Sequence, residues 1–237
     1  MTQRLDVGAT LRRAVELCKA EWRILVGLTI VVEIPILIAD TASIRFLDID
    51  VSRTAAVESV AAGLILVMWT TLAHHLLLAV VERVEASARR GHPRPVVGKV
   101  LRDLPIGRLL LADVLVTVAL VVGLLLLVIP GIAVAVWTAP LFPLLTMERK
   151  RVLPTVRRSI AIVRGSAWRV LAVIGLLYIA SQLAGLVVAA LLHDAPIIDA
   201  IAHVGVVLVF EPLSSAAIVI ATFALVDLDA ARRSPVV

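Results

Sequence analysis

Two long apolar segments joined by Pro-Gly dominate the middle of the chain. The first is Leu109–Ile129 and the second is Ala133–Met147, with Pro130-Gly131-Ile132 between them. A helix of about twenty apolar residues crosses the hydrocarbon core of a bilayer, because each residue adds about 1.5 Å. Pro-Gly is a turn signal, and no polar loop lies beside it. This pattern predicts a tight helical hairpin inside a membrane.

The composition agrees with a membrane protein. Apolar residues make up 61% of the chain and the mean hydropathy is +1.04, whereas a soluble domain is about 45–50% apolar. The only cysteine is Cys18, so an internal disulfide framework is excluded. The net charge is +5, but the cations alternate with apolar spans and only 4% of residues are aromatic. We therefore expect no nucleic-acid partner.

Apolar segments elsewhere in the chain predict further transmembrane helices. We therefore expect an all-α, polytopic membrane protein. Residues 1–21 are predicted to form a cytoplasmic amphipathic helix, because Leu11, Ala14, Val15 and Cys18 share one face. We expect this helix to be retained rather than cleaved as a signal peptide. The whole chain, 1–237, is interpreted as one membrane domain. The six predicted transmembrane spans are 24–39, 60–81, 109–129, 133–147, 170–192 and 201–226.

The charge of the loops predicts the topology. Basic residues fill the N-terminus, the loops 82–108 and 148–169, and the C-terminal tail. The intervening connections contain only Arg45 and Arg53. Because cytoplasmic loops collect Lys and Arg, six spans with both termini in the cytoplasm fit every crossing. We expect the protein in the plasma (inner) membrane.

A repeat suggests that the spans form three hairpins. Leu11-Arg12-Arg13-Ala14-Val15 precedes Trp22-Arg23, and Val156-Arg157-Arg158-Ser159-Ile160 precedes Trp168-Arg169 in the same way. Residues 97–108 give a weaker version without the tryptophan. Three hairpins, each with a cytoplasmic interfacial helix, would explain the similarity. The alternative is that inner loops collect arginine and interfaces collect tryptophan without any repeat.

These motifs also resemble those of a known family. They comprise Leu5-Asp6-Val7-Gly8, Leu127 to Ile132, Glu148, Arg157-Arg158-Ser159, Val163-Arg164-Gly165 and Trp168-Arg169. The chain resembles a group of bacterial and archaeal proteins similar to the membrane domain attached to some glycerophosphoryl diester phosphodiesterases. Many members of this group are of unknown function. The resemblance implies a prokaryotic six-helix membrane protein. It does not imply phosphodiesterase activity, which belongs to a separate soluble barrel that we do not expect in this chain.

Ionisable residues inside the spans are the first candidate site. Glu33, His74 and Glu211 each fall deep in a predicted span, where a charge costs about 2.5–3.5 kcal/mol. They could form a proton or cation path, or serve as polar contacts between packed helices. Successive histidines, His74 and His75, point to different faces and are a poor metal pair. We expect no catalytic residue, metal or cofactor.

The basic segment after the hairpin is the second candidate site. Arg157, Arg158, Arg164 and Arg169 could bind anionic lipid headgroups or phosphate, since each cation near an anionic surface contributes about 1 kcal/mol. Topology setting and general headgroup contact are the simpler explanation. The apolar stripe of the same segment, expected to face the membrane or the bundle, is Val152, Val156, Ile160 and Val163.

Two functions follow from these sites. The first is a non-enzymatic scaffold or accessory subunit that binds anionic lipid, another membrane protein or a second copy. The alternative is a small transporter or channel-like permease that uses Glu33, His74 and Glu211. A transporter predicts a polar cavity at mid-membrane, whereas a scaffold predicts a dry interior packed with Leu and Val. A membrane-embedded enzyme is the third interpretation.

Overall fold

The described part of the chain is helical throughout, which confirms the all-α prediction. The computed structural model describes residues 5–46, 74–148, 151–192 and 196–233, and these contain no strand. A helical stretch at 74–89 follows the first helix. The other helices are α1 (Val7–Phe46), α3 (Val97–Arg102), α4 (Ile106–Leu126), α5 (Val128–Thr138), α6 (Leu141–Glu148), α7 (Val152–Val163), α8 (Ala167–Leu192) and α9 (Pro196–Arg233).

Four segments in the described part are long and apolar enough to cross a bilayer. They are Ile106–Gly123, Val128–Glu148, Ala167–Leu192 and Ile201–Arg233. Large aliphatic side chains on them are exposed, up to 78% for Ile129, as is expected where lipid surrounds a helix. The chain is therefore a membrane-embedded protein. Of the two other predicted spans, 24–39 lies within α1, and 60–81 lies outside the described residues as far as residue 73.

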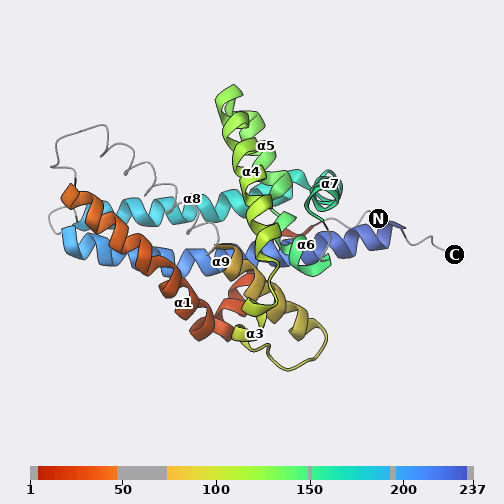
Figure 1. The fold of residues 1–237 in the computed structure, drawn as a ribbon, viewed down its shortest axis with the longest axis horizontal. Coiled ribbons are helices and arrows are strands. Elements are labelled where there is room, and N and C mark those ends of the chain that lie inside the picture. Colours follow the sequence, from red (N-terminus) through yellow and green to blue (C-terminus); the bar gives the residue numbers. More distant parts are fainter. Residues whose placement is uncertain (1–4, 47–73, 149–150, 193–195, 234–237) are drawn as a thin grey trace.

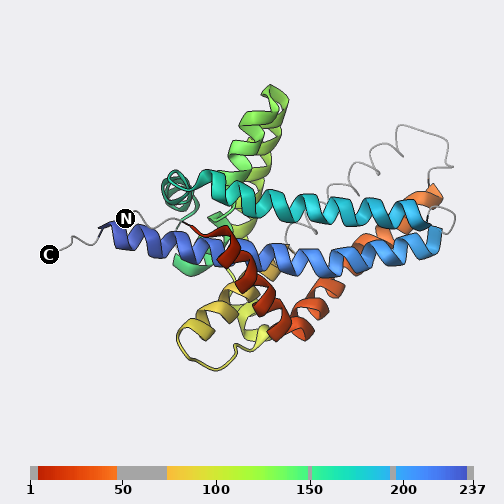
Figure 2. The ribbon, with the colours of Figure 1, turned by 180° about the vertical axis from the view of Figure 1, so that it is seen from behind.

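The helices form two groups that cross each other. Helices α8 and α9 run side by side, and the second half of α1 crosses α9 (Figure 1). Helices α4 and α5 rise together across the α8–α9 pair, and the view from behind shows the same arrangement (Figure 2). Helices α6 and α7 lie where the two groups meet. The hairpin predicted from the central apolar segments is thus a distinct projecting element.

The main core joins helices that are distant in the sequence. It contains Leu17 and Leu25 from α1, Leu77 from the stretch 74–89, and Ala216 and Ala217 from α9. Small residues such as these alanines let helices approach closely. A second cluster packs Leu5 against Leu225 and Val163. The N-terminal end of the described chain therefore lies beside the C-terminal half of α9.

The amphipathic segment and the first predicted span are one kinked helix. Helix α1 (Val7–Phe46) consists of two helical parts that meet at a kink, where Glu21 has non-helical dihedral angles (φ −116°, ψ 17°). Glu21 is buried and its Oε1 lies 2.8 Å from Nε of Arg94. The charged residues at the predicted boundary are tolerated at a kink, because an ion pair satisfies the buried carboxylate.

The turn of the hairpin lies at Leu127, so its predicted position at Pro130-Gly131 is wrong. Leu127 is extended (φ −170°, ψ 152°), and α5 begins at Val128. Proline is tolerated in the first turn of a helix, where its missing N–H would have had no partner. A Cβ added to Gly123 would lie 3.1 Å from Cα of Gly131. The two glycines therefore allow the α4 and α5 backbones to touch just below the turn.

The fourth predicted span, 133–147, is broken. Helix α5 ends at Thr138, Ala139 and Pro140 form a turn, and α6 begins at Leu141. The break occurs where proline cannot donate a helical hydrogen bond. The break thus lies at Pro140, the first of the two prolines in this segment, and Pro143 is accommodated within α6.

Candidate functional site

His74 and Glu211, two of the predicted intramembrane residues, contact each other. His74 belongs to the stretch 74–89, and Glu211 lies midway along α9, next to Pro212. Nδ1 of His74 meets Oε1 of Glu211, and each side chain is 30% exposed. Pairing satisfies two polar groups that would be costly alone in hydrocarbon. Pro212 has no N–H to donate, so the carbonyl of Leu208 lacks its usual helical hydrogen bond and makes this part of α9 more polar.

Glu33, the third residue of the predicted set, lies on α1. It is half-buried and makes a polar or electrostatic interaction of its own. The structure therefore directly joins two members of the set, His74 and Glu211, through the contact between the stretch 74–89 and α9.

A second histidine–carboxylate pair was missed from the sequence. Nε2 of His75 lies 3.2 Å from Oδ1 of Asp113 on α4, and the His75 side chain is only 3% exposed. Its ring stacks on Phe142, with centroids 3.6 Å apart. Its Nδ1 has no hydrogen-bond partner among the described residues. The expectation that successive histidines point to different faces is confirmed, and that geometry could have indicated two carboxylate partners on two helices.

A groove between α8 and α9 opens beside the first pair. Its volume is about 650 Å³, and Glu211 is part of its lining. Other polar residues contribute to the lining, namely Tyr178, Ser181, Gln182, His203 and Ser214. The remaining lining is mainly Leu, Val and Ile from both helices. The hydroxyl of Ser215, one turn from Glu211, is buried without a partner in the described ranges.

The four predicted arginines separate into two kinds at the α7–α8 elbow, by which we mean residues 151–169. Arg158 is 23% exposed and its guanidinium contacts both Glu148 and Asp229, the latter at 3.2 Å. Arg157 and Arg164 are exposed and Arg169 is half-exposed. No ion pair connects these three to another described residue.

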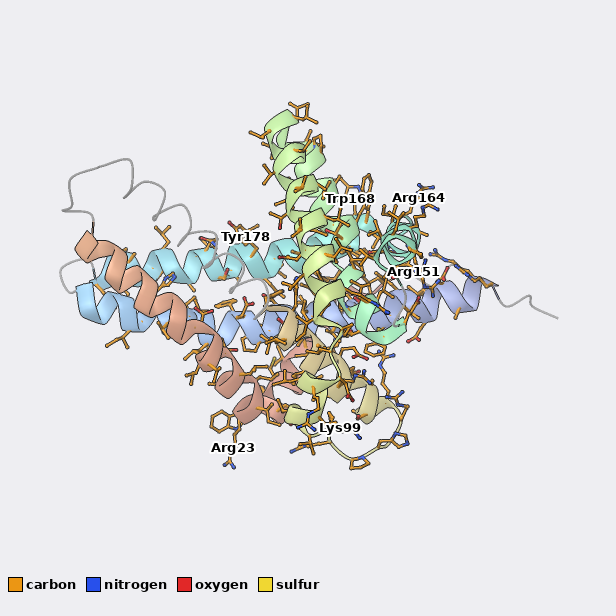
Figure 3. All side chains as sticks on the ribbon, in the orientation of Figure 1. Arg23, Lys99, Arg151, Arg164, Trp168 and Tyr178 are labelled. Carbon is orange, nitrogen blue, oxygen red and sulfur yellow. The ribbon has the colours of Figure 1, made fainter. Side chains whose placement is uncertain are left out.

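Aromatic exposure marks the same elbow. Trp168 is 82% exposed at the beginning of α8, and Figure 3 shows it beside Arg164 on the outside of the molecule. Tryptophan is enriched where a helix enters the membrane interface. The elbow therefore combines an exposed aromatic side chain with arginines that make no ion pair among the described residues.

Helix α7 packs through residues of the predicted apolar stripe and through polar residues beside it. Val152 and Val163 are buried as expected, but Val156 and Ile160 are only half-buried. The polar residues Thr155 and Ser159 are buried with them, together with Ile162. The Ser159 hydroxyl donates a hydrogen bond to the Trp137 carbonyl at 2.6 Å, and that of Thr155 donates to the Arg151 carbonyl at 2.9 Å. These hydroxyls are small and satisfied, so hydropathy alone did not indicate their burial.

Other arginines near the ends of the helices are neutralised by carboxylates. Arg13 and Arg89 both contact Glu85, each at 3.1 Å. Arg89 also lies 2.9 Å from Asp227 and 4.4 Å above the ring of Phe223. This network ties α1, the stretch 74–89 and α9 together.

The described residues offer no evident metal centre. No group of three or more His, Cys, Asp or Glu side chains in those ranges is placed to hold a metal ion. The described residues form two histidine–carboxylate pairs, a groove and a basic elbow. No protein-family model, curated protein or solved structure matches this chain.

Proposed function

We propose that this protein is a non-enzymatic plasma-membrane protein that binds anionic lipid headgroups at the α7–α8 elbow. It would act as a scaffold or accessory subunit, with a second copy or another membrane protein as its partner. The observation that carries the proposal is the division of the arginines. Arg158 is occupied by Glu148 and Asp229, whereas Arg157, Arg164 and Arg169 have no carboxylate partner among the described residues.

The energetics favour lipid phosphate as the missing partner. Each cation near an anionic membrane surface contributes about 1 kcal/mol, so the three unpaired arginines contribute about 3 kcal/mol together. Trp168 is exposed where α8 starts, which supports a position of this level of the molecule at the membrane interface, where tryptophan is enriched. Arg158 has the different role of holding α6, α7 and α9 in the arrangement that presents the elbow.

Six spans with both termini in the cytoplasm are part of the same proposal. Four apolar helices support membrane crossing, and the alternation of basic loops supports the orientation. The packing of Leu5 against Leu225 adds support, because ends that lie together are expected for an even number of crossings.

The proposal is tested by lipid retention in native mass spectrometry. We compare phosphatidylglycerol with phosphatidylcholine for the wild type and for Arg157→Gln/Arg164→Gln. The double variant should lose roughly 30-fold in phosphatidylglycerol affinity, since about 2 kcal/mol of attraction is removed. Phosphatidylcholine retention should not change. The same spectra report whether a second copy is bound.

Two further variants serve as controls. Arg12→Gln/Arg90→Gln removes the same charge from exposed arginines outside the elbow and should leave retention close to wild type. Arg158→Gln should lower the melting temperature. It should reduce phosphatidylglycerol affinity less than the elbow double variant does. Equal losses from the elbow and control double variants would show that only the general positive charge matters, and the proposed site would then be rejected.

A further inference from the structure

We propose that Arg232, at the end of α9, completes the α7–α8 elbow and that the completed site binds a lipid with two phosphates. This inference rests on the proposed function, because it names the lipid class for the same site. The phosphates occupy two positions on the exposed face of the elbow. Arg164 and Arg232 form the first position, and Arg157 forms the second.

Gly165 gives the Arg232 side chain its place beside the elbow. A Cβ added to Gly165 would lie 3.1 Å from Nη1 and 3.3 Å from Nη2 of Arg232. The guanidinium from α9 therefore lies against the backbone of the residue that follows Arg164. Both arginines are exposed. The tertiary structure thus adds to the elbow a cation that is distant from it in the sequence.

Asp229, one turn before Arg232 on α9, is engaged by other arginines. It lies 3.0 Å from Arg233 and 3.2 Å from Arg158. Neither Arg232 nor Arg164 makes an ion pair with another described residue. Positive charges held close together repel each other, so an anion placed between them is stabilised by both. Phosphate suits this position, because arginine donates two parallel hydrogen bonds to phosphate oxygens.

Helix α7 supplies the second position. Arg157 and Arg164 are seven residues apart, which puts them on one face of the helix and about 10 Å apart along its axis. Arg164 has helical dihedral angles (φ −47°, ψ −37°) at the end of α7, so the face continues to it. Ala161 lies between the two arginines and is exposed. No large side chain of α7 therefore separates the two phosphate positions.

Exposed apolar side chains flank these cations. Leu153, one turn before Arg157 on the same face, is 61% exposed, and Trp168 is 82% exposed. Figure 3 shows Trp168 beside Arg164 on the outside of the molecule. Lipid around these side chains removes apolar surface from water, which is favourable, whereas a free diphosphate would leave them in water. The surface therefore fits a lipid rather than a soluble anion.

The covalent link between the phosphates explains why one lipid is preferred to two. When the first phosphate is bound, the link holds the second near Arg157 at a high effective concentration. Two lipids with one phosphate each lose translational and rotational freedom separately. A two-phosphate lipid should therefore bind more tightly than phosphatidylglycerol at the same concentration of phosphate.

The test compares cardiolipin, which has two phosphates, with phosphatidylglycerol by native mass spectrometry of the purified full-length protein. Titration at equal phosphate concentration gives the affinity for each lipid. The wild type should prefer cardiolipin at least about tenfold. Inorganic pyrophosphate at the same phosphate concentration should not displace cardiolipin, because it brings no acyl chains.

Three variants test the place of Arg232. Arg232→Gln should lower the preference for cardiolipin about fivefold, since the remaining arginines still hold a single phosphate. Gly165→Leu should lower it similarly without any change of charge, because its side chain fills the space of the Arg232 guanidinium. Arg233→Gln is the matched control, since it removes the same charge from the adjacent position and should leave the preference close to the wild-type value. The melting temperature of each variant checks its folding.

Specific results would overturn the inference. Equal affinity of the wild type for both lipids would reject the two-phosphate site, whereas the proposed function would fail only if phosphatidylglycerol were retained no better than phosphatidylcholine. Equal effects of Arg232→Gln and Arg233→Gln would exclude Arg232 from the site. Displacement by pyrophosphate would assign the site to a free diphosphate instead of a lipid. If Gly165→Leu does not fold, the comparison of Arg232→Gln with Arg233→Gln decides.

Discussion

At the scale of single residues, burial controls chemistry at Cys18. This residue lies on α1 before the predicted first span and packs against the main core. Burial raises the pKa of its thiol from 9.0 to about 11, because removal from water disfavours the thiolate. The folded state therefore favours the neutral thiol. The buried neutral thiol therefore contributes to the free energy of unfolding below about pH 9, and this contribution is lost as the pH rises through about 11.

We predict that Cys18 reacts slowly with iodoacetamide. The thiolate is the nucleophile, so at pH 8 the native protein should react roughly 100-fold more slowly than an exposed peptide thiol. The rate should rise about tenfold per pH unit between pH 8 and pH 10. Intact-mass spectrometry over time measures the alkylation, with SDS-denatured protein as the control. A rate that levels off near pH 9 would contradict the shifted pKa.

Histidines show how pairing, rather than residue type, defines a site. His74 and His75 are adjacent in sequence but contact carboxylates on two different helices, α9 and α4. Only Glu211 among these carboxylates lines the groove. Successive positions on a helix diverge by about 100°, so one dipeptide links two neighbouring helices. The two pairs thus join the stretch 74–89 to α9 and to α4.

At the scale of elements, the projecting hairpin depends on a glycine contact. Gly123 on α4 faces the backbone of Gly131 on α5, with no space for a side chain. Close backbone approach compensates in lipid for the absence of a hydrophobic driving force between helices. The hairpin is therefore stabilised near its turn by close packing of the two helix backbones. Pro130 favours the start of α5.

We predict that Gly123→Ala weakens this hairpin. The new Cβ would lie 3.1 Å from the Gly131 Cα, which forces the helices apart and should cost about 1–3 kcal/mol. Gly175→Ala on α8 is the matched control, because nothing lies within 4 Å of its added Cβ. The control should be neutral or stabilising by up to about 1 kcal/mol. Unfolding in detergent measures both changes, and equal destabilisation would argue against a specific glycine contact.

Ion pairs organise the ends of the elements. Arg158 joins α7 to α6 and α9, and Arg89 joins the stretch 74–89 to α9. Their carboxylate partners include Asp227 and Asp229 near the end of α9. A positive loop is thus partly neutralised from within the molecule, whereas Arg157, Arg164 and Arg169 at the elbow make no ion pair with another described residue. This distribution could not be obtained from counting loop charges.

At the scale of the whole molecule, topology is the decisive property. We predict that single cysteines in a Cys18→Ser background label from outside the cell at positions 52, 127 and 195. Those at positions 90 and 150 should label only after the membrane is permeabilised. The expectation follows from the alternation of basic loops. An impermeant maleimide measures accessibility, with a mass tag as readout.

The outcome at position 127 has a particular meaning. It marks the observed turn of the hairpin between α4 and α5. Labelling at 52 and 195 without labelling at 127 from either side would indicate a hairpin embedded in the bilayer and four complete crossings. Labelling at 150 from outside would contradict the proposed orientation.

The amino-acid sequence by itself determined the helical membrane class and the apolar segments. These properties depend on local composition. The tertiary structure decided that His74 meets Glu211, 137 positions away, and that Arg158 rather than Arg157 is paired. It also moved the hairpin turn to Leu127. Such pairings depend on the rotation and register of helices distant in the chain, which hydropathy and spacing within one segment do not contain.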